Sequence, residues 1–410
     1  MNDKPANATA MRALQVICGA AALLLPSSVV AEPVAPAVDP IRVLVKRLDL
    51  ERYKATIKSL TRFGDRRQGT ARNRAAIDWI ATQLKSYGCT NTERLRYTFG
   101  DEPVHRVAPA RAAVAKGSDE PGLSVGGGRS RGVTRPTGVN TDPTAQPDAR
   151  IRALDTPPAV AGTREEVYCT KIGSLHPNEM YIVSAHMDGI GFGEAANDDG
   201  SGTALVMELA RVLSSPDVRT DRSIRFILWN NEETGLNGAR AYVDQRASLQ
   251  GKEWPVSSGR YPEPKWLGVI QHDMMLFDHG MPRADGSMSP RQRPEADVNI
   301  EFQAASKFAA QSQELAGALQ AANERYATDY PAAVGRHMTN TDSTPFMDLA
   351  PAVSLRENER GAQVGSGWDP QWHQPTDLYS TYDDKDFLLG LNAAQTTLSA
   401  TARLAGATLR

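Results

Sequence analysis

The stretch 181–202, YIVSAHMDGIGFGEAANDDGSG, constrains the fold of this chain more than any other. It begins with a short apolar run at 181–185 that favours a buried strand, and residues 204–213 after it have the three-to-four spacing of an amphipathic helix. The segment is therefore predicted to be a strand, a loop and a helix. His186 and Asp188 directly follow the strand, and in open α/β sheets the ligand crevice lies outside the carboxyl ends of the strands.

The same alternation of extended and helical patterns continues along the chain. Helical patterns occupy 41–60, 75–87 with Asn73 as N-cap, 238–248, 312–326 and 386–404, and extended patterns occupy 89–99, 164–173, 223–230, 266–275 and 350–355. Such alternation predicts a three-layer α/β/α fold, with a mostly parallel, mixed and twisted sheet flanked by helices on both faces. The strand at 164–173 is expected to pair with 181–185 through a turn at 176–178.

The N-terminus differs from the rest of the chain. Arg12 precedes an apolar run at 13–25, and Pro26 and small residues follow up to Ala31. This pattern predicts a signal peptide at 1–31, although a buried N-terminal helix would also be apolar. The run is too short to span a bilayer. We therefore expect a protein exported to the periplasm or secreted, without a stable membrane anchor, whose residues 32–410 form a single domain.

The global composition excludes some partners and leaves one segment without a fold. A formal net charge of -2 over 410 residues gives no reason to expect nucleic acid as a partner. Residues 100–162 are rich in Arg, Pro, Gly and Ser without periodicity, so they are predicted to be a flexible insertion. Cys89 and Cys169 remain after removal of the leader, and in an exported protein they form either a disulfide or two buried thiols.

Imidazole and carboxylate groups gather at the predicted strand ends, in a chain without a nucleophile elbow, a P-loop or a dinucleotide fingerprint. The available donors are His186, Asp188, Asp198, Asp199, Glu232, Glu233, Asp273 and His373. These types are zinc ligands, but they are too many for one tetrahedral ion. A pair of ions, bridged by one carboxylate and sharing a water, would use them. Cobalt or manganese would suit the same donors, which discriminate poorly among divalent ions.

Five short motifs carry a resemblance to a known family. They are HMD at 186–188, NDDGSG at 197–202, NEETG at 231–235, Asp273 in QHDM and His373 in QWHQPTD. In this order and at these intervals they resemble the M28 family of zinc aminopeptidases. The segment 66–84, RRQGTARNRAAIDWIATQL, is similar to that family's N-terminal helix. The resemblance implies a zinc-exopeptidase-like fold with two Zn²⁺ ions and peptides as substrates, from which N-terminal residues are hydrolysed.

The resemblance also implies a role for each matching residue. His186 and Asp273 would hold one zinc, Glu233 and His373 the other, and Asp198 would bridge them. Glu232 would be the general base and acid, because adjacent residues in extended chain point in opposite directions and leave it beside the metal-bound water. The resemblance further implies a cis peptide bond between Asp198 and Asp199.

Several neighbouring residues are expected to support the ligands. Asp188 would accept the second imidazole proton of His186, and Asp377 would do the same for His373. Asp199 is expected to cap the helix that follows it. His272 should face away from Asp273 as a core histidine with its hydrogen bonds satisfied.

The chain also departs from the family pattern at two places. Trp372 stands where some members have a Tyr before the last His ligand. Residues 341–346, TDSTPF, replace a Ser-Asp-His-Pro-Phe type segment, which leaves open whether Asp342 contacts substrate or supports the site. Arg356 and Glu357 follow a strand near the site, where Arg356 would contact substrate or form an ion pair.

Three alternatives to an aminopeptidase remain open from the sequence. A glutaminyl cyclase shares the fold but uses one zinc, a carboxypeptidase would grip the other end of the peptide, and a non-catalytic binding homologue would have lost ligands. The full ligand set favours hydrolysis. The preferred N-terminal residue and the oligomeric state do not follow from the sequence.

Overall fold

The computed structural model describes residues 39–100, 139–277, 298–338, 340–357 and 369–410. The predicted signal peptide and the first part of the predicted insertion lie outside the described residues. Contacts group Asp39–Arg410 into one compact unit. Within the described residues, no helix has both the length and the apolar character that a bilayer span requires.

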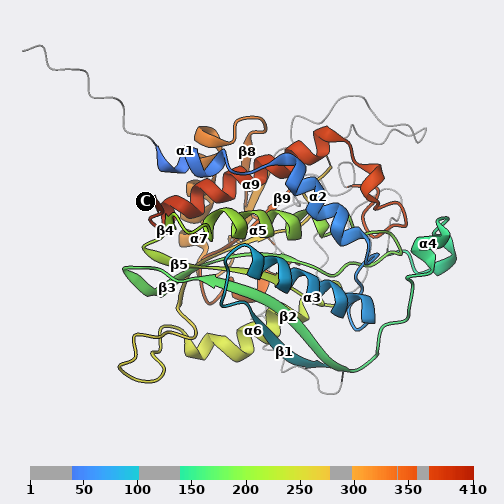
Figure 1. Cartoon of the computed structure of the whole chain (residues 1–410), viewed down its shortest axis with the longest axis horizontal. Helices are drawn as coiled ribbons and strands as arrows, with labels where there is room; N and C mark the ends of the chain where they lie inside the picture. Colours follow the sequence, from blue (N-terminus) through green and yellow to red (C-terminus); the bar gives the residue numbers. More distant parts are fainter. Residues whose placement is uncertain (1–38, 101–138, 278–297, 339, 358–368) are drawn as a thin grey trace, which may run out of the picture. The chain divides into compact units, whose positions relative to one another are not determined.

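Eight strands form one sheet in the order β1-β2-β5-β3-β6-β9-β7-β8 (Figure 1). Their bounds are β1 Glu93–Phe99, β2 Gly162–Lys171, β3 His176–His186, β5 Arg222–Trp229, β6 Lys265–His272, β7 Val298–Phe302, β8 Ala332–Gly335 and β9 Ala352–Arg356. The four central strands, β5, β3, β6 and β9, are parallel, whereas β2 and β7 run antiparallel to their central neighbours. The carboxyl ends of the central strands therefore meet at one edge, as the sequence predicts for the site.

Helices cover both faces of this sheet, as expected for the predicted three-layer class. The helices of the described residues are α1 Pro40–Val45, α2 Leu50–Thr61, α3 Ala71–Ser86, α4 Ala149–Arg152, α5 Gly200–Leu213, α6 Asn237–Arg246, α7 Ala309–Tyr326 and α9 Asp384–Leu404, of which α4 lies away from the sheet (Figure 1). The larger apolar core joins one face to α2, α3, α5, α7 and α9, and a smaller aromatic core joins the other face to α6 (Figure 1). A separate two-stranded sheet pairs β4 Val218–Arg219 with β10 Thr408–Leu409.

The predicted pairing of β2 with β3 is wrong, because β5 lies between them. The main-chain N–H groups of Ser174 and His176 donate to the carbonyls of Thr220 and Asp221, which directly precede β5. The connection after β2 therefore passes around the start of β5 and does not form a hairpin. β5 is buried over almost its whole length, as expected for a strand in the interior of a sheet that is covered on both faces.

Local capping shifts two helix starts from their predicted positions. The predicted helix 41–60 is divided into α1 and α2, because Asp49 caps a new helix by accepting the N–H of Arg52. The N-cap of α3 is Thr70 rather than Asn73. The Asn73 amide instead donates to the carbonyl of Arg66 and to Oδ1 of Asn230, so this residue joins α3 to the loop after β5.

The predicted insertion is folded over its last part. Residues 139–161 contain the 3₁₀ turn Pro143–Ala145 and α4, and both Gln146 and Ile151 are buried. The prediction of a segment without structure is thus wrong for this part, where buried side chains and hydrogen bonds to other parts of the chain contribute to offsetting the entropy of ordering. The structure also joins Cys89 to Cys169 in a disulfide, with 5.9 Å between their Cα atoms, which decides between the two alternatives for these cysteines.

Candidate metal centre

The residues that the sequence predicts as ligands converge at the carboxyl edge of the central strands. His186 ends β3, Asp273 follows β6, and Glu233 lies in the loop after β5. Asp198 precedes α5, and His373 lies in the loop before α9. All five side chains are at least nine-tenths buried. Segments almost two hundred positions apart in the sequence thus meet at one point.

Two groups of potential ligands share Asp198. In the first, which we call the strand group, His186 Nε2 lies 3.2 Å from Asp198 Oδ1 and 3.8 Å from Asp273 Oδ1. In the second, the loop group, His373 Nε2 lies 3.0 Å from Asp198 Oδ2 and 2.8 Å from Glu233 Oε2. Each oxygen of Asp198 therefore belongs to a different group, which is the geometry of a bridging carboxylate.

The electrostatics of the two groups fit bound cations. Burial, with added repulsion from Glu233, Asp273 and Asp198, raises the pKa of Glu232 to about 8. Burial likewise raises the pKa of Glu233 to about 7. Carboxylates crowded in a dry site repel each other, and a divalent cation would relieve that repulsion.

At His373 and Asp198, the neighbouring charged groups outweigh the effect of burial on the pKa. Burial by itself would lower the pKa of His373, but the carboxylates of Glu233 and Asp198 raise it to about 10. Burial would raise the pKa of Asp198, but hydrogen bonds from His186 and His373 lower it to about 2. The carboxylates thus favour a positive charge beside them, which either a protonated imidazole or a metal ion would supply.

One unpartnered oxygen also fits a metal. Oε1 of Glu233 is buried without a hydrogen-bond partner among the residues that the structure describes. Two imidazoles and three carboxylates form a nitrogen and oxygen donor set that suits zinc.

Asp188 contacts His186 through its main-chain carbonyl, and not through its carboxylate as the sequence predicts. Nδ1 of His186 forms its hydrogen bond with the main-chain carbonyl of Asp188 at 3.0 Å, whereas the nearer carboxylate oxygen lies 4.0 Å away. That oxygen accepts the main-chain N–H of Glu232 at 3.1 Å instead. Asp188 therefore orients His186 with its backbone and the Glu232 loop with its side chain.

The predicted role of Asp377 is also wrong. Its two oxygens accept the main-chain N–H groups of Asn197 and Asp198, at 2.8 and 3.1 Å, and the structure shows no bond to His373. Asp377 thus holds the bridging residue. The His373 ring is instead stacked on Trp372, with 3.9 Å between ring centroids and 25° between planes.

Asp199 and His272 behave as predicted. Asp199 is the N-cap of α5, where it accepts the N–H of Gly202. It also accepts the N–H groups of His186 and Met274, which ties the ends of β3 and β6 together. The peptide bond between Asp198 and Asp199 is cis, as the resemblance implied. His272 has both ring nitrogens in hydrogen bonds, to Ser184 and Thr397, and burial lowers its pKa to about 4.

Arg356 and Asp342 differ in their surroundings, because only Arg356 contacts a candidate ligand. Nη2 of Arg356 donates to Oδ2 of Asp273, so the ion-pair alternative holds and Arg356 supports a ligand of the strand group. Asp342 is fully buried, and neither carboxylate oxygen has a hydrogen-bond partner in the described part of the chain. Burial, followed by the charge of Glu232, raises its pKa well above the usual range.

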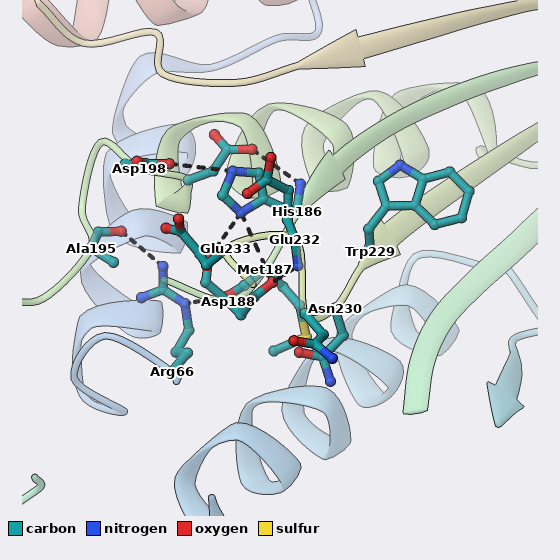
Figure 2. Close-up of polar contacts among 12 residues, drawn as sticks. Arg66, His186, Met187, Asp188, Ala195, Asp198, Trp229, Asn230, Glu232 and Glu233 are labelled. Carbon is teal, nitrogen blue, oxygen red and sulfur yellow. Dashed lines mark hydrogen bonds and ion pairs between the residues drawn. The ribbon is translucent and has the colours of Figure 1, made fainter. Parts of the chain in front are cut away.

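Sequence reasoning missed Arg66, although it lies in the RRQGTARN segment. Its buried guanidinium donates to the carbonyls of Met187 at 2.7 Å, Glu194 at 2.9 Å and Ala195 at 2.8 Å. Figure 2 shows this side chain reaching the chain that leads from His186 toward Asp198. A buried cation bonded only to carbonyls could not be inferred from a polar N-terminal segment.

Sequence reasoning also missed a group of buried polar residues that bond to Asn197, the residue before Asp198. The side-chain amide of Asn197 donates to both oxygens of Glu357, at 3.1 and 3.0 Å, and to Asp369 at 2.9 Å. Tyr382 lies within hydrogen-bond distance of Asp369 and Asp377. The NDDGSG motif points to Asn197, but no motif marks its partners.

Comparison with known proteins agrees with this geometry. Residues 168–389, over half of the chain, match the model of Peptidase family M28. Aminopeptidase YwaD of Bacillus subtilis is 45% identical over 82 residues, which are 20% of this chain and 17% of that protein. Carboxypeptidase Q of Xenopus laevis is 36% identical over 73 residues, 18% of this chain and 16% of that protein. The matched segments thus span less than a fifth of these relatives.

Solved structures share the fold over most of the chain. An aminopeptidase from Aneurinibacillus sp. strain AM-1 has a TM-score of 0.56 at 19% identity, with 88% of this chain and 95% of that chain covered. A zinc aminopeptidase from Bacillus subtilis gives 0.56 at 16% identity, covering 87% and 95%. A glutaminyl cyclase from Porphyromonas gingivalis gives 0.51 at 16% identity, covering 87% and 98%.

Proposed function

Because this chain belongs to peptidase family M28, we propose that it is a zinc-dependent aminopeptidase that hydrolyses N-terminal residues from peptides. The observation that carries the proposal is the division of Asp198 between the strand group and the loop group. One carboxylate that faces two histidines through its two oxygens suits two ions, and a one-ion enzyme would not need the strand group and the loop group together.

Each proposed ligand has a defined place in this arrangement. His186 and Asp273 would hold one Zn²⁺, Glu233 and His373 would hold the other, and Asp198 would contact both. When bound, the ions would polarise the scissile carbonyl and lower the pKa of the attacking water. Arg356 would keep one oxygen of Asp273 engaged and so limit how that ligand can rotate.

Glu232 is proposed as the residue that moves the proton. Its N–H donates to the carboxylate of Asp188, and the residue is only 8% exposed. A carboxylate in a water-poor site whose pKa lies near neutrality can take a proton from water and return it to the leaving amine. The raised pKa of Glu232, about 8, agrees with that role.

Export is part of the proposal. The N-terminal pattern of Arg12, an apolar run and small residues supports a signal peptide. The Cys89–Cys169 disulfide independently supports an oxidising compartment such as the periplasm or the cell exterior.

The two enzymatic alternatives keep a basis in the comparisons. Carboxypeptidase Q is among the partial relatives, and a glutaminyl cyclase shares the fold. A panel of substrates therefore distinguishes these alternatives from an aminopeptidase.

The test combines metal analysis with a substrate panel on the chain from residue 32. We expect two zinc ions per chain and release of p-nitroaniline from free aminoacyl p-nitroanilides, but none from their N-acetyl counterparts. Cleavage of N-blocked peptides at the C-terminus would replace the proposal by a carboxypeptidase. One zinc with cyclisation of N-terminal glutamine would replace it by a cyclase, and a folded protein without metal or turnover would favour a binding homologue.

A further inference from the structure

His373 lacks the support that the other histidine of the centre has. His186 is oriented by a hydrogen bond from Nδ1, but Nδ1 of His373 is buried without a partner among the described residues. Its backbone also has a φ of +57°, a left-handed conformation that non-glycine residues adopt only when their surroundings impose it. Apart from its stacking on Trp372, the direction of the His373 ring therefore depends on how its main chain is held.

That main chain is held by a short segment of the folded insertion. The N–H of Asn140 donates to the carbonyl of His373 at 3.0 Å. Gln146 Nε2 donates to the carbonyl of Pro375 at 2.9 Å, two residues farther along the same loop. In Figure 1, α4 and the chain before it lie near the loop that leads into α9, and these bonds establish the contact.

Gln146 also bonds to a second loop of the centre. Its Nε2 donates to the carbonyl of Phe192 at 2.8 Å, and Phe192 lies in the chain between His186 and Asp198. Its Oε1 accepts the N–H of Asp148 at 3.0 Å, which fixes the orientation of the amide. Only 1% of Gln146 is exposed, so both N–H groups are used in a dry environment.

The two loops that Gln146 joins are in close contact. A Cβ added to Gly191 would lie 2.3 Å from the carbonyl carbon of His373. The N–H of Glu194 donates to the carbonyl of Asp377 at 2.8 Å. A small displacement of either loop would therefore move His373 relative to Asp198, which lies at the end of the other loop.

We propose that Gln146 is a positioning residue for His373 and thereby sets the cation affinity of the loop group. The inference rests on the proposed zinc function, but it concerns a residue outside the family match at 168–389. It assigns a function to the end of the predicted insertion, because Asn140 and Gln146 bond to the main chain of the loop that carries His373.

The variants are chosen to separate positioning from general stability. Gln146→Met keeps the length of the side chain and removes both donors, and Gln146→Asn keeps the amide but shortens its reach. Gln250→Met is the matched control. The Gln250 amide also joins two main-chain groups, the N–H of Trp266 at 2.9 Å and the carbonyl of Ala247 at 3.4 Å, near the end of β6 opposite Asp273.

Metal-free protein of each variant is titrated with Zn²⁺ and, in a separate experiment, with Co²⁺, whose binding is measured by visible absorption. For Gln146→Met we expect one of two binding steps to weaken by about 10- to 100-fold, as for other residues that orient a ligand, with a smaller change for Gln146→Asn. Gln250→Met should bind as the wild type does. Peptidase activity of Gln146→Met should be low at limiting zinc and recover at saturating zinc.

The outcomes are distinct. Folded Gln146→Met or Gln146→Asn with two unchanged binding steps would overturn the positioning role. Equal weakening in Gln250→Met would also overturn it, since the effect would then reflect stability alone. If the wild type bound no zinc, the proposed function itself would fail. If Gln146→Met does not fold, Gln146→Asn and Gln250→Met decide.

Discussion

The strand group and the loop group share Asp198 but are held in different ways. In the strand group, His186 and Asp273 lie at the ends of β3 and β6, which pair directly through Ala185 and His272. Asp199 then accepts the N–H groups of His186 and Met274. The separation of these ligands thus follows from the spacing of neighbouring strands.

The loop group has no such frame. Glu233 lies four residues beyond the end of β5, and His373 lies in a loop with left-handed backbone. The loop group depends on contacts between loops: Trp372 stacks on His373, Asp377 accepts the N–H groups of Asn197 and Asp198, and Gln146 bonds to the loop that carries His373. One half of the centre is thus defined by sheet topology, and the other half by packing between loops.

The largest effect is expected at Asp198, which belongs to both groups. Asp198→Ala should remove the shared ligand, abolish binding of both ions and reduce peptidase activity to background. Metal content after dialysis, together with turnover, measures this. Retention of one tightly bound ion would show that the strand group is independent of the bridge and would break the proposed symmetry of Asp198.

The next effect separates proton transfer from metal binding. Glu232→Gln should lower kcat by about 10²- to 10⁴-fold, because it removes a general base, while both ions remain bound. Steady-state kinetics and metal analysis on the same sample provide the measurement. Substantial activity in this variant would show that another group moves the proton.

Arg66 tests the chain that connects the two groups. Arg66→Met leaves several buried carbonyls without donors, so the free energy of unfolding should fall by about 3 kcal/mol or more. Arg67→Met is the control, because Arg67 lies over the ring of Phe192 at 5.4 Å and should contribute less than about 1 kcal/mol. Urea denaturation of metal-free protein compares them. Equal losses in both variants would mean that Arg66 has no special role.

The smallest effect concerns the acidic residues behind the loop group. Burial raises the pKa of Asp369 to about 6, from an ordinary value of 3.8. The folded state therefore binds this proton more tightly than the unfolded state, so stability falls as pH rises from about 4 to 6 and the loss is complete above the folded pKa. The shift corresponds to about 2–3 kcal/mol.

Denaturation of metal-free protein between pH 4 and 7 measures this dependence. Asp369→Asn should flatten the curve over that window, whatever constant change its altered hydrogen bonds cause. An unchanged slope would mean that Asp369 is not the group that titrates, and would direct attention to Asp377, whose pKa burial raises to about 7.

Much of the strand group could be predicted from the sequence. Apolar runs that end in His186 or lead to Asp273 define parallel strands, and parallel strands present their ends at one edge. The supporting roles were harder to predict. Their spacing along the chain predicts that Asp188 and Asp377 accept protons from the histidines, but in the structure both carboxylates accept main-chain N–H groups. Spacing in a loop does not determine which way a carboxylate turns.

The sequence by itself determined the layered α/β class and the end of the strands where chemistry is concentrated, because hydrophobic periodicity is a local property, and the resemblance of five short motifs to a known family implied the five candidate ligands. Only the tertiary structure decided the insertion of β5 between β2 and β3, the bonds of Arg66 to the chain after β3 and the contact of Gln146 with the His373 loop. These features depend on buried polar groups that find partners far away in the chain, and no local pattern records which partner is nearest once the core has closed.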